Sequence, residues 1–288
     1  MSIKPSELII NDKGRIYHID CGPDDLANTI ITVGDPDRVK RVSKYFDKIE
    51  VIRSHREFVT HTGYIGNKRI SVISTGIGPD NIDIVINEID ALFNINLATR
   101  SPEANRTSLK FIRIGTSGTL QRDIPVDSFI KSQGVFGLDN LMYFYQYEKE
   151  KSLENLEKSF NAFMKFEDVK AYAFMSSDDL SQKLGKGFIQ GMTITCPGFY
   201  GPQGRKLRLT PRYNDFLEKA SQWSMDDIRA TNFEMETSAI YGLSHVLGHD
   251  ALSLSAIIAN RPNGTFSKDP YNTVESLIQS ALAEIVDL

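Results

Sequence analysis

Short runs of apolar, β-forming residues alternate along this chain with stretches whose apolar residues recur at helical spacing. This alternation predicts a layered α/β fold, because each helix can cover a face of the sheet that the strands build. Several runs are apolar almost throughout, which is typical of strands covered on both faces. We expect strands at Thr29–Val33, Arg69–Ser74, Leu109–Ile114, Val126–Lys131, Gly191–Thr195 and Ala251–Ala259. We expect helices at Asp37–Phe46, Asn81–Phe93, Ser176–Leu184, Pro211–Ser221, Glu236–Leu247 and Thr273–Val286.

Length and local composition indicate one domain. The chain has 288 residues, which is enough for one large α/β domain and short for two. The segment Ala98–Ser108 is a polar insertion, and Tyr143–Asp168, with its aromatic and charged residues, is a charged helix or a surface excursion. Neither has the composition of a linker, so we predict a single domain over residues 1–288.

Charge and hydropathy exclude several classes of protein. A net charge of -4 argues against a nucleic-acid binder, although a few arginines in one pocket could still hold a small anion. No apolar run approaches the roughly 20 residues that a membrane-spanning helix needs, so we expect no membrane partner. The first residues contain no signal-peptide core, so we expect a cytoplasmic protein. Cys21 and Cys196 are far apart and lack a metal-binding motif, so we expect both thiols to be reduced.

Three glycine-rich turns follow predicted strands, and ligands of open α/β sheets gather at the carboxyl ends of strands. The segment 34–38 (GDPDR) offers an anion a close backbone and an arginine; alternatively, Asp35 or Asp37 caps the next helix. The segment 113–118 (RIGTSG) can form an anion nest, and an inward-pointing arginine there needs a partner. The segment 74–79 (STGIGP) carries no cation and is either a similar nest or a tight turn.

Two carboxylates stand one residue apart in the segment 232–236 (NFEME), which we interpret as the start of a helix. Residues two apart on a helix do not share a face, so Glu234 and Glu236 are not expected to form the acid–base couple of a glycosidase. One carboxylate directed into a cleft could grip two adjacent sugar hydroxyls. Alternatively, both occupy the helix N-terminus because its dipole favours negative charge.

Five segments follow one another along the chain: GDPDR, SHREF (54–58), STGIG, RIGTSG and NFEMET. Together they resemble the nucleoside phosphorylase family, and most of all its uridine phosphorylase branch. The resemblance runs from about His18 to the C-terminal helix. It implies a three-layer α/β/α sandwich with a central mixed, partly barrel-like sheet. It also implies a pentosyltransferase of pyrimidine salvage, which reversibly splits uridine with phosphate into uracil and ribose 1-phosphate.

The same resemblance implies which residues bind phosphate and sugar. Five residues would bind substrate within a single subunit: Gly34, Arg38, Arg113, Thr116 and Gly118. The first four of these would hold the phosphate. Three further residues would bind substrate, with Met235 packing beneath the sugar: Glu234, Met235 and Glu236. Glu236 would hold the 2′- and 3′-hydroxyls. Arg56 would reach the phosphate from a neighbouring subunit and His18 would contact the 5′-hydroxyl, so a homodimer is the smallest active unit, with a trimer of dimers as the larger alternative.

Two further segments bear on the choice of base. The pattern Phe-x3-Gln-x-Arg in 199–205 (FYGPQGR) resembles a uracil clamp. Gln203 can offer a donor and an acceptor to the uracil edge, Arg205 can donate to O4, and Phe199 would stack on a ring face. Arg261 stands where purine-preferring relatives carry an aspartate that protonates purine N7, which counts against purines.

The implied chemistry is mainly a matter of positioning. Phosphate is a nucleophile at neutral pH, so neither a general base nor a cofactor is required beyond phosphate as co-substrate. Arg205 and Gln203 would stabilise the negative charge that develops on uracil, and Arg113 completes the catalytic set. The alternatives are a purine nucleoside phosphorylase, a nucleoside hydrolase of the same fold, and a non-catalytic nucleoside-binding protein.

Metal ions have little support in the sequence. The resemblance leaves room for a monovalent cation near Glu57, but Asn81 replaces the serine that is usual beside it. His245 and His249 have the i,i+4 spacing of zinc-binding helices without a third ligand, so we assign no metal site.

Overall fold

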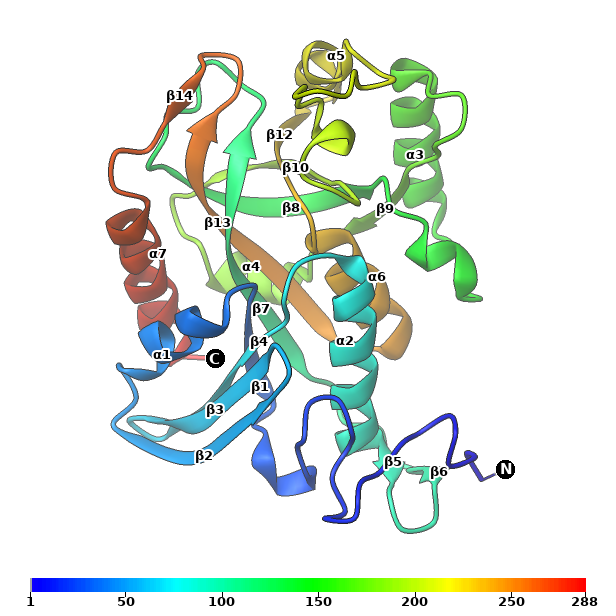
Figure 1. The fold of residues 1–288 in the computed structure, drawn as a ribbon, viewed down its shortest axis with the longest axis vertical. Helices are drawn as coiled ribbons and strands as arrows, with labels where there is room; N and C mark the ends of the chain where they lie inside the picture. The colour runs from blue at the N-terminus through cyan, green and yellow to red at the C-terminus, as the bar shows by residue number, and fades with distance from the viewer. Residues whose placement is uncertain (1) are drawn as a thin grey trace.

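Strands and helices alternate through most of the chain (Figure 1), and the computed structural model describes residues 2–288. The strands are β1 (Thr29–Val33), β2 (Lys48–His55), β3 (Phe58–Ile65), β4 (Lys68–Ser74), β5 (Ile95–Asn96), β6 (Ser101–Pro102), β7 (Lys110–Thr119), β8 (Phe129–Gly137), β9 (Tyr172–Met175), β10 (Ile189–Thr195), β11 (Ser224–Met225), β12 (Ile228–Glu234), β13 (Asp250–Asn260) and β14 (Thr265–Phe266). The helices are α1 (Pro36–Ser43), α2 (Pro79–Asn94), α3 (Lys151–Met164), α4 (Asp178–Lys183), α5 (Phe216–Gln222), α6 (Thr237–Leu247) and α7 (Pro270–Ile285). Short 3-10 helices are η1 (Pro23–Asp25), η2 (Leu141–Phe144) and η3 (Gly201–Gln203).

A mixed sheet forms the centre of the molecule. Its main path runs β11-β12-β10-β8-β13-β7-β1-β4-β3-β2, and β9 and β14 pair with β8 and β13. The pairs β1–β4, β1–β7 and β7–β13 are parallel, whereas β2–β3 and β3–β4 are antiparallel. β12 also pairs with β7, which closes β12, β10, β8, β13 and β7 into a ring. This closed ring is the barrel-like part of the sheet.

Two large hydrophobic cores lie on the two faces of the sheet, beside a small cluster of Ile124, Ile130 and Ile257. One includes apolar residues of α2, α3, α5 and α6, and the other includes those of α1, α4 and α7. In Figure 1, α1 and α7 accordingly lie on one side of the sheet and α2 and α6 on the other. The α/β architecture with a mixed, partly barrel-like sheet is confirmed. Among residues 2–288, no helix is both long enough and apolar enough to cross a membrane.

Several elements differ from the sequence predictions. The strand expected at Val126–Lys131 begins only at Phe129 and continues to Gly137, because Asp127 adopts a left-handed turn conformation with φ 67°. The helix expected from Pro211 begins at Phe216. The hairpin of β2 and β3 was missed, because β2 is an edge strand without a buried residue and the buried residues of β3 include the polar Thr60, His61 and Thr62. The polar insertion contains β6, which pairs with β5, and the charged helix expected within Tyr143–Asp168 is α3.

Candidate functional site

A cavity of about 740 Å³ opens at the carboxyl ends of β1, β4, β7, β12 and β13. The sequence-predicted residues that line it are Gly34, Arg38, Arg113, Thr116, Gly118, Phe199, Gln203, Arg205, Glu234, Met235 and Glu236. Glu57 and Asn81 also line it. The structure thus brings together residues that are up to 202 positions apart in the chain, from Gly34 to Glu236. Arg56, His18 and Arg261 are not part of the lining.

Arg38 lies in the first turn of α1, which Asp35 caps by accepting the N–H of Asp37 at 2.9 Å. The capping and the anion-site interpretations of this turn are therefore compatible. Arg38 donates through Nη1 to the carbonyl of Ile114 at 3.3 Å, while its buried Nε has no hydrogen-bond partner among residues 2–288. Burial, and then the nearby charge of Arg113, lower the pKa of Arg38 to about 10. The guanidinium is still charged at neutral pH, so its free donor favours an anion.

Arg113 is buried at the centre of the cavity wall. Its Nη2 lies 2.6 Å from Glu236 Oε2 and 3.2 Å from Glu234 Oε2, and its Nη1 donates to Ser255 Oγ at 3.2 Å. Burial alone would lower the pKa of Arg113, but the two carboxylates outweigh burial and raise it. A Cβ atom at residue 115 would lie 2.0 Å from Arg113 Nη1, so Gly115 makes room for the guanidinium.

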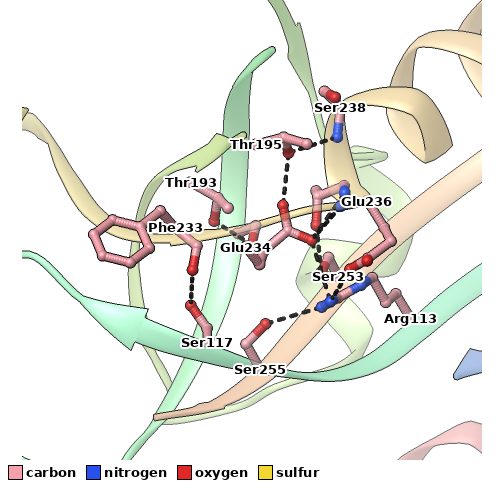
Figure 2. Close-up of polar contacts among 12 residues, drawn as sticks. Arg113, Ser117, Thr193, Thr195, Phe233, Glu234, Glu236, Ser238, Ser253 and Ser255 are labelled. Atoms are coloured by element: carbon pink, nitrogen blue, oxygen red, sulfur yellow. Dashed lines mark hydrogen bonds and ion pairs between the residues drawn. The ribbon is translucent and has the colours of Figure 1, made fainter. Parts of the chain in front are cut away.

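Glu234 and Glu236 converge on Arg113, as Figure 2 shows. The prediction that they point to different faces of a helix is wrong, because Glu234 ends β12 and Glu236 is the N-cap residue of α6. The chain turns at Met235, and this turn brings the two carboxylates together. Glu236 Oε1 also accepts the N–H of Gly78 at 3.0 Å. Burial raises the pKa of Glu236 against the lowering effect of Arg113.

Phe199, Gln203 and Arg205 meet at the other end of the cavity. The guanidinium carbon of Arg205 lies 3.6 Å from the centre of the Phe199 ring. Arg205 Nη1 donates to the Phe199 carbonyl at 2.7 Å and also to Gln203 Oε1. Gln203 is buried, whereas Phe199 is 49% exposed. Burial, and then repulsion from Arg261, lower the pKa of Arg205 to about 10, so it can donate to a ligand at neutral pH.

Arg261 follows β13 and supports the base end from outside the cavity. Its Nη1 donates to the backbone carbonyl of Gln203 at 3.2 Å, and its guanidinium carbon lies 5.5 Å from the centre of the Phe233 ring. Arg205 lies over the same ring at 5.8 Å. Arg261 therefore contacts the loop that carries Gln203.

His18 and Arg56 lie together in a separate surface patch. Arg56 is exposed between β2 and β3 with φ 55°, and its guanidinium carbon lies 5.9 Å from the centre of the Tyr17 ring. Tyr17 also packs against His18, whose Nδ1 pairs with Glu88. A single chain does not bring this patch into the cavity.

The two candidate cation ligands meet at the turn after β4. A Cβ atom at Gly76 would lie 2.4 Å from Asn81 Nδ2 and 3.3 Å from Glu57 Cγ. Throughout residues 2–288, no group of three or more His, Cys, Asp or Glu side chains could hold a metal ion. His249 is used within the fold, since its ring bonds to the N–H of Leu109 at 3.2 Å and to Asp90 at 3.1 Å.

Sequence reasoning missed several residues of the site. Ile77, Ser117, Phe233, Ile258 and Phe266 line the cavity, and Ser255 holds Arg113. A signal for Ser255 is present in Ala251–Ala259, where Ser253 and Ser255 alternate with apolar residues and so share one face of the strand.

Comparison with known proteins agrees with this architecture. The family model of the phosphorylase superfamily matches residues 28–287, so the chain belongs to that superfamily. It is 30% identical over 260 residues to a uridine phosphorylase of Thermococcus kodakarensis, covering 89% of this chain and 82% of the relative. It is 28% identical over 239 residues to a uridine phosphorylase of Haemophilus influenzae, covering 82% and 81% of the two chains. A purine nucleoside phosphorylase of Buchnera aphidicola is 25% identical over 272 residues, with 93% and 98% covered.

Solved structures share the fold. A Trypanosoma brucei nucleoside phosphorylase described as showing uridine phosphorylase activity superimposes with a TM-score of 0.89 at 28% identity, covering 98% of this chain and 100% of that one. A uridine phosphorylase of the oomycete Phytophthora capsici has a TM-score of 0.70 at 20% identity, covering 100% and 99%, and bears on the fold alone. The predicted family is thereby confirmed.

Proposed function

We propose that this chain is a uridine phosphorylase, which reversibly converts uridine and phosphate into uracil and ribose 1-phosphate. One observation carries the proposal: a single cavity is lined by Arg38 with a free donor, by buried Glu236, and by the Gln203–Arg205 pair. These groups suit an anion, two sugar hydroxyls and the polar edge of uracil. The similar uridine phosphorylases of T. kodakarensis and H. influenzae support the same reaction.

The charges at the phosphate end support an active unit of two subunits. Within one chain, the two cavity arginines at this end face the two glutamates that contact Arg113, and Asp35 and Glu57 add further negative charge to the lining. A phosphate dianion therefore needs a further cation, which Arg56 of a neighbouring subunit would supply. His18 shares the surface patch of Arg56 and would reach the 5′-hydroxyl in the same way. A homodimer is the smallest assembly that completes both sites, and a trimer of dimers is a larger one.

Phosphate and sugar binding would place the nucleophile beneath C1′. Gly34, Thr116 and Gly118 would let the backbone and a hydroxyl approach the phosphate beside Arg38. Glu236 would accept hydrogen bonds from the 2′- and 3′-hydroxyls while Met235 packs against the sugar. The main catalytic contribution is then orientation of the two reactants.

Base departure leaves negative charge on uracil. Arg205 and Gln203 would stabilise that charge where it develops, and Phe199 would stack on the ring. Gln203 Oε1 already accepts from Arg205, which leaves its amide N–H groups free to donate to a uracil carbonyl. A second lone pair on the same oxygen can accept the N3–H. The clamp thus suits a base with alternating carbonyl and N–H groups.

Cofactor, location and pathway complete the proposal. Inorganic phosphate is the co-substrate, and no organic cofactor takes part. In this chain, a monovalent cation would have one carboxylate, Glu57, and one amide, Asn81, as ligands. We therefore do not propose that the reaction depends on such a cation. We place the enzyme in the cytoplasm and in pyrimidine salvage.

Base release from a nucleoside panel tests the proposal. The protein is incubated with uridine, inosine and adenosine, with and without phosphate, and free bases are quantified by chromatography. We expect uracil release only when phosphate is present, and little release from the purine nucleosides. Efficient inosine cleavage would indicate a purine nucleoside phosphorylase, phosphate-independent release a hydrolase, and binding without turnover a nucleoside-binding protein.

Mixing two inactive variants tests the shared site. Arg56→Ala and Arg205→Ala subunits are combined after reversible dissociation. In a mixed dimer, one site would contain both arginines and regain activity. Full activity of an Arg56→Ala protein, or of a monomer in sedimentation, would contradict the shared site.

A further inference from the structure

Thr195 ends β10 and is buried beside the cavity without lining it. Its Oγ1 donates to Glu234 Oε1 at 2.6 Å and accepts the N–H of Ser238 at 2.9 Å, as Figure 2 shows. A hydroxyl has one hydrogen, so that hydrogen is committed to Glu234. Thr195 therefore connects the carboxylate to the first turn of α6.

Glu234 uses both oxygens within the protein. Its Oε2 accepts the N–H groups of Glu236 and Thr237, each at 2.9 Å, and lies 3.2 Å from Arg113 Nη2. The first N–H groups of a helix lack partners within the helix. Glu234 and Thr195 together satisfy three of them at the start of α6, including the N–H of Glu236. This contact fixes the backbone from which the Glu236 side chain extends.

We infer that Thr195 is a positioning residue for the reaction proposed above, on which this inference rests. Its hydroxyl orients Glu234, and Glu234 in turn orients Arg113 and the N-terminus of α6. Glu236 and Arg113 are then held ready for sugar and phosphate before either arrives. Glu234 accordingly hydrogen-bonds only within the protein and positions the site, and Glu236 is the carboxylate that hydrogen-bonds the sugar.

Removal of the hydroxyl has a defined consequence. In Thr195→Val, the side chain keeps its shape, but Ser238 N–H loses its acceptor and Glu234 loses a donor. Glu234 and Glu236 share the single guanidinium of Arg113, so a loosened Glu234 disturbs the position of both partners. Gln203 and Arg205 take no part in these contacts. The inference therefore predicts a loss at the sugar and phosphate end and none at the base end.

Paired binding measurements on the full-length protein test this inference. Uridine and free uracil are titrated by calorimetry into wild type, Thr195→Val and Thr195→Ser, and steady-state kcat and KM are measured. We expect Thr195→Val to bind uridine about tenfold more weakly, a change that corresponds to ~1.4 kcal/mol, which is typical of a buried polar group left without a partner. We expect kcat to fall as well, uracil binding to stay unchanged, and Thr195→Ser to restore wild-type values.

Two further variants control for the loss of any buried hydroxyl and for misfolding of Thr195→Val. Thr62→Val removes an equally buried hydroxyl that bonds Ser71 outside the cavity and should leave all values unchanged. Thr195→Ala provides a second hydroxyl-free variant if Thr195→Val does not fold. Unchanged uridine binding without the hydroxyl, an equal loss of uracil and uridine, or failure of Thr195→Ser to restore activity would each overturn the inference. Failure of wild type to bind uracil and uridine would instead refute the uridine assignment itself, and with it the role of Thr195.

Discussion

At the phosphate and sugar end of the cavity, Arg113 lies within β7, Glu234 ends β12 and Glu236 caps α6. All three are buried, and both glutamates form ion pairs with Arg113. At the base end, Phe199 and Arg205 stand on a loop, where a ring–guanidinium stack and two hydrogen bonds hold them. These three residues form the rigid part of the first end, because each of their charges has a fixed partner in the fold. The arrangement of the base end depends on contacts that a bound ligand can replace. Substitution of one of these paired charges should therefore lower stability as well as activity, whereas substitution at the base end should lower activity alone.

The largest effect is expected for Arg113→Ala. Removal of the guanidinium leaves two carboxylates buried without a countercharge, which typically costs ~3–5 kcal/mol of folding free energy. Urea denaturation should show this loss, and any remaining folded protein should have a raised KM for phosphate and a low kcat. A stability equal to that of wild type would remove the contrast between the two ends.

Arg205→Ala should lower activity without lowering stability. Arg205 would stabilise the negative charge that develops as the base departs. Its loss should cost about 3 kcal/mol of transition-state stabilisation and should therefore lower both kcat and kcat/KM. The KM for phosphate and the midpoint of urea denaturation should stay close to wild type. Arg208→Ala, an exposed arginine on the same loop, serves as the control. A stability loss comparable to that of Arg113→Ala would show that the loop is part of the rigid end.

Arg38→Ala tests the unpaired cation at the phosphate end. Its hydrogen bonds to an anion are charge-assisted and worth roughly 1.5–3 kcal/mol, so the KM for phosphate should rise by about ten- to a hundredfold. Stability should change little or improve, because Arg38 has no carboxylate partner to leave stranded. Lys40→Ala, exposed on the same helix, is the matched control in steady-state assays. An unchanged phosphate KM would move the anion site away from α1.

The smallest effect is expected for Phe199→Leu. The ring stacks on Arg205 while half exposed, and such cation–π contacts contribute about 0.5–1 kcal/mol. Uridine affinity should fall only a few-fold by calorimetry, with no change for phosphate. Leu207→Ala, on the same exposed loop, should have no effect. A loss as large as that of Arg205→Ala would mean that the ring, rather than the guanidinium, dominates the base end.

Much of the fold was predictable because buried strands are continuous apolar runs. β1 has the predicted bounds, Thr29–Val33, and β13 extends its predicted range by one residue at each end. The edge strand β2 was not predictable in this way, since none of its residues is buried. β12 was missed because its end merges with the start of α6 in sequence, and only tertiary pairing with β10 and β7 separates them.

The candidate site was predictable to the extent that its residues lie in short motifs. The sequence and the family resemblance identified most of the residues that line the cavity. They did not show that Glu234 and Glu236 converge on Arg113, because this contact depends on the turn between β12 and α6. Ser255 and Thr195 were missed for a similar reason, since each acts through a partner that is distant in the chain. The roles of Arg56 and His18 stay predictions, because they depend on a second subunit.

The pairing of β12 with β7 has a further consequence for local unfolding and amide hydrogen exchange. Each of the five strands in the ring has a partner on both sides, so none of them can peel away alone. Their amide hydrogens should exchange with solvent water only when the ring opens as a unit. The amides of β2, which has a partner on one side only, should exchange by local fraying. Because β7 and β12 carry Arg113 and Glu234, the phosphate and sugar end belongs to the slowest-exchanging part of the molecule.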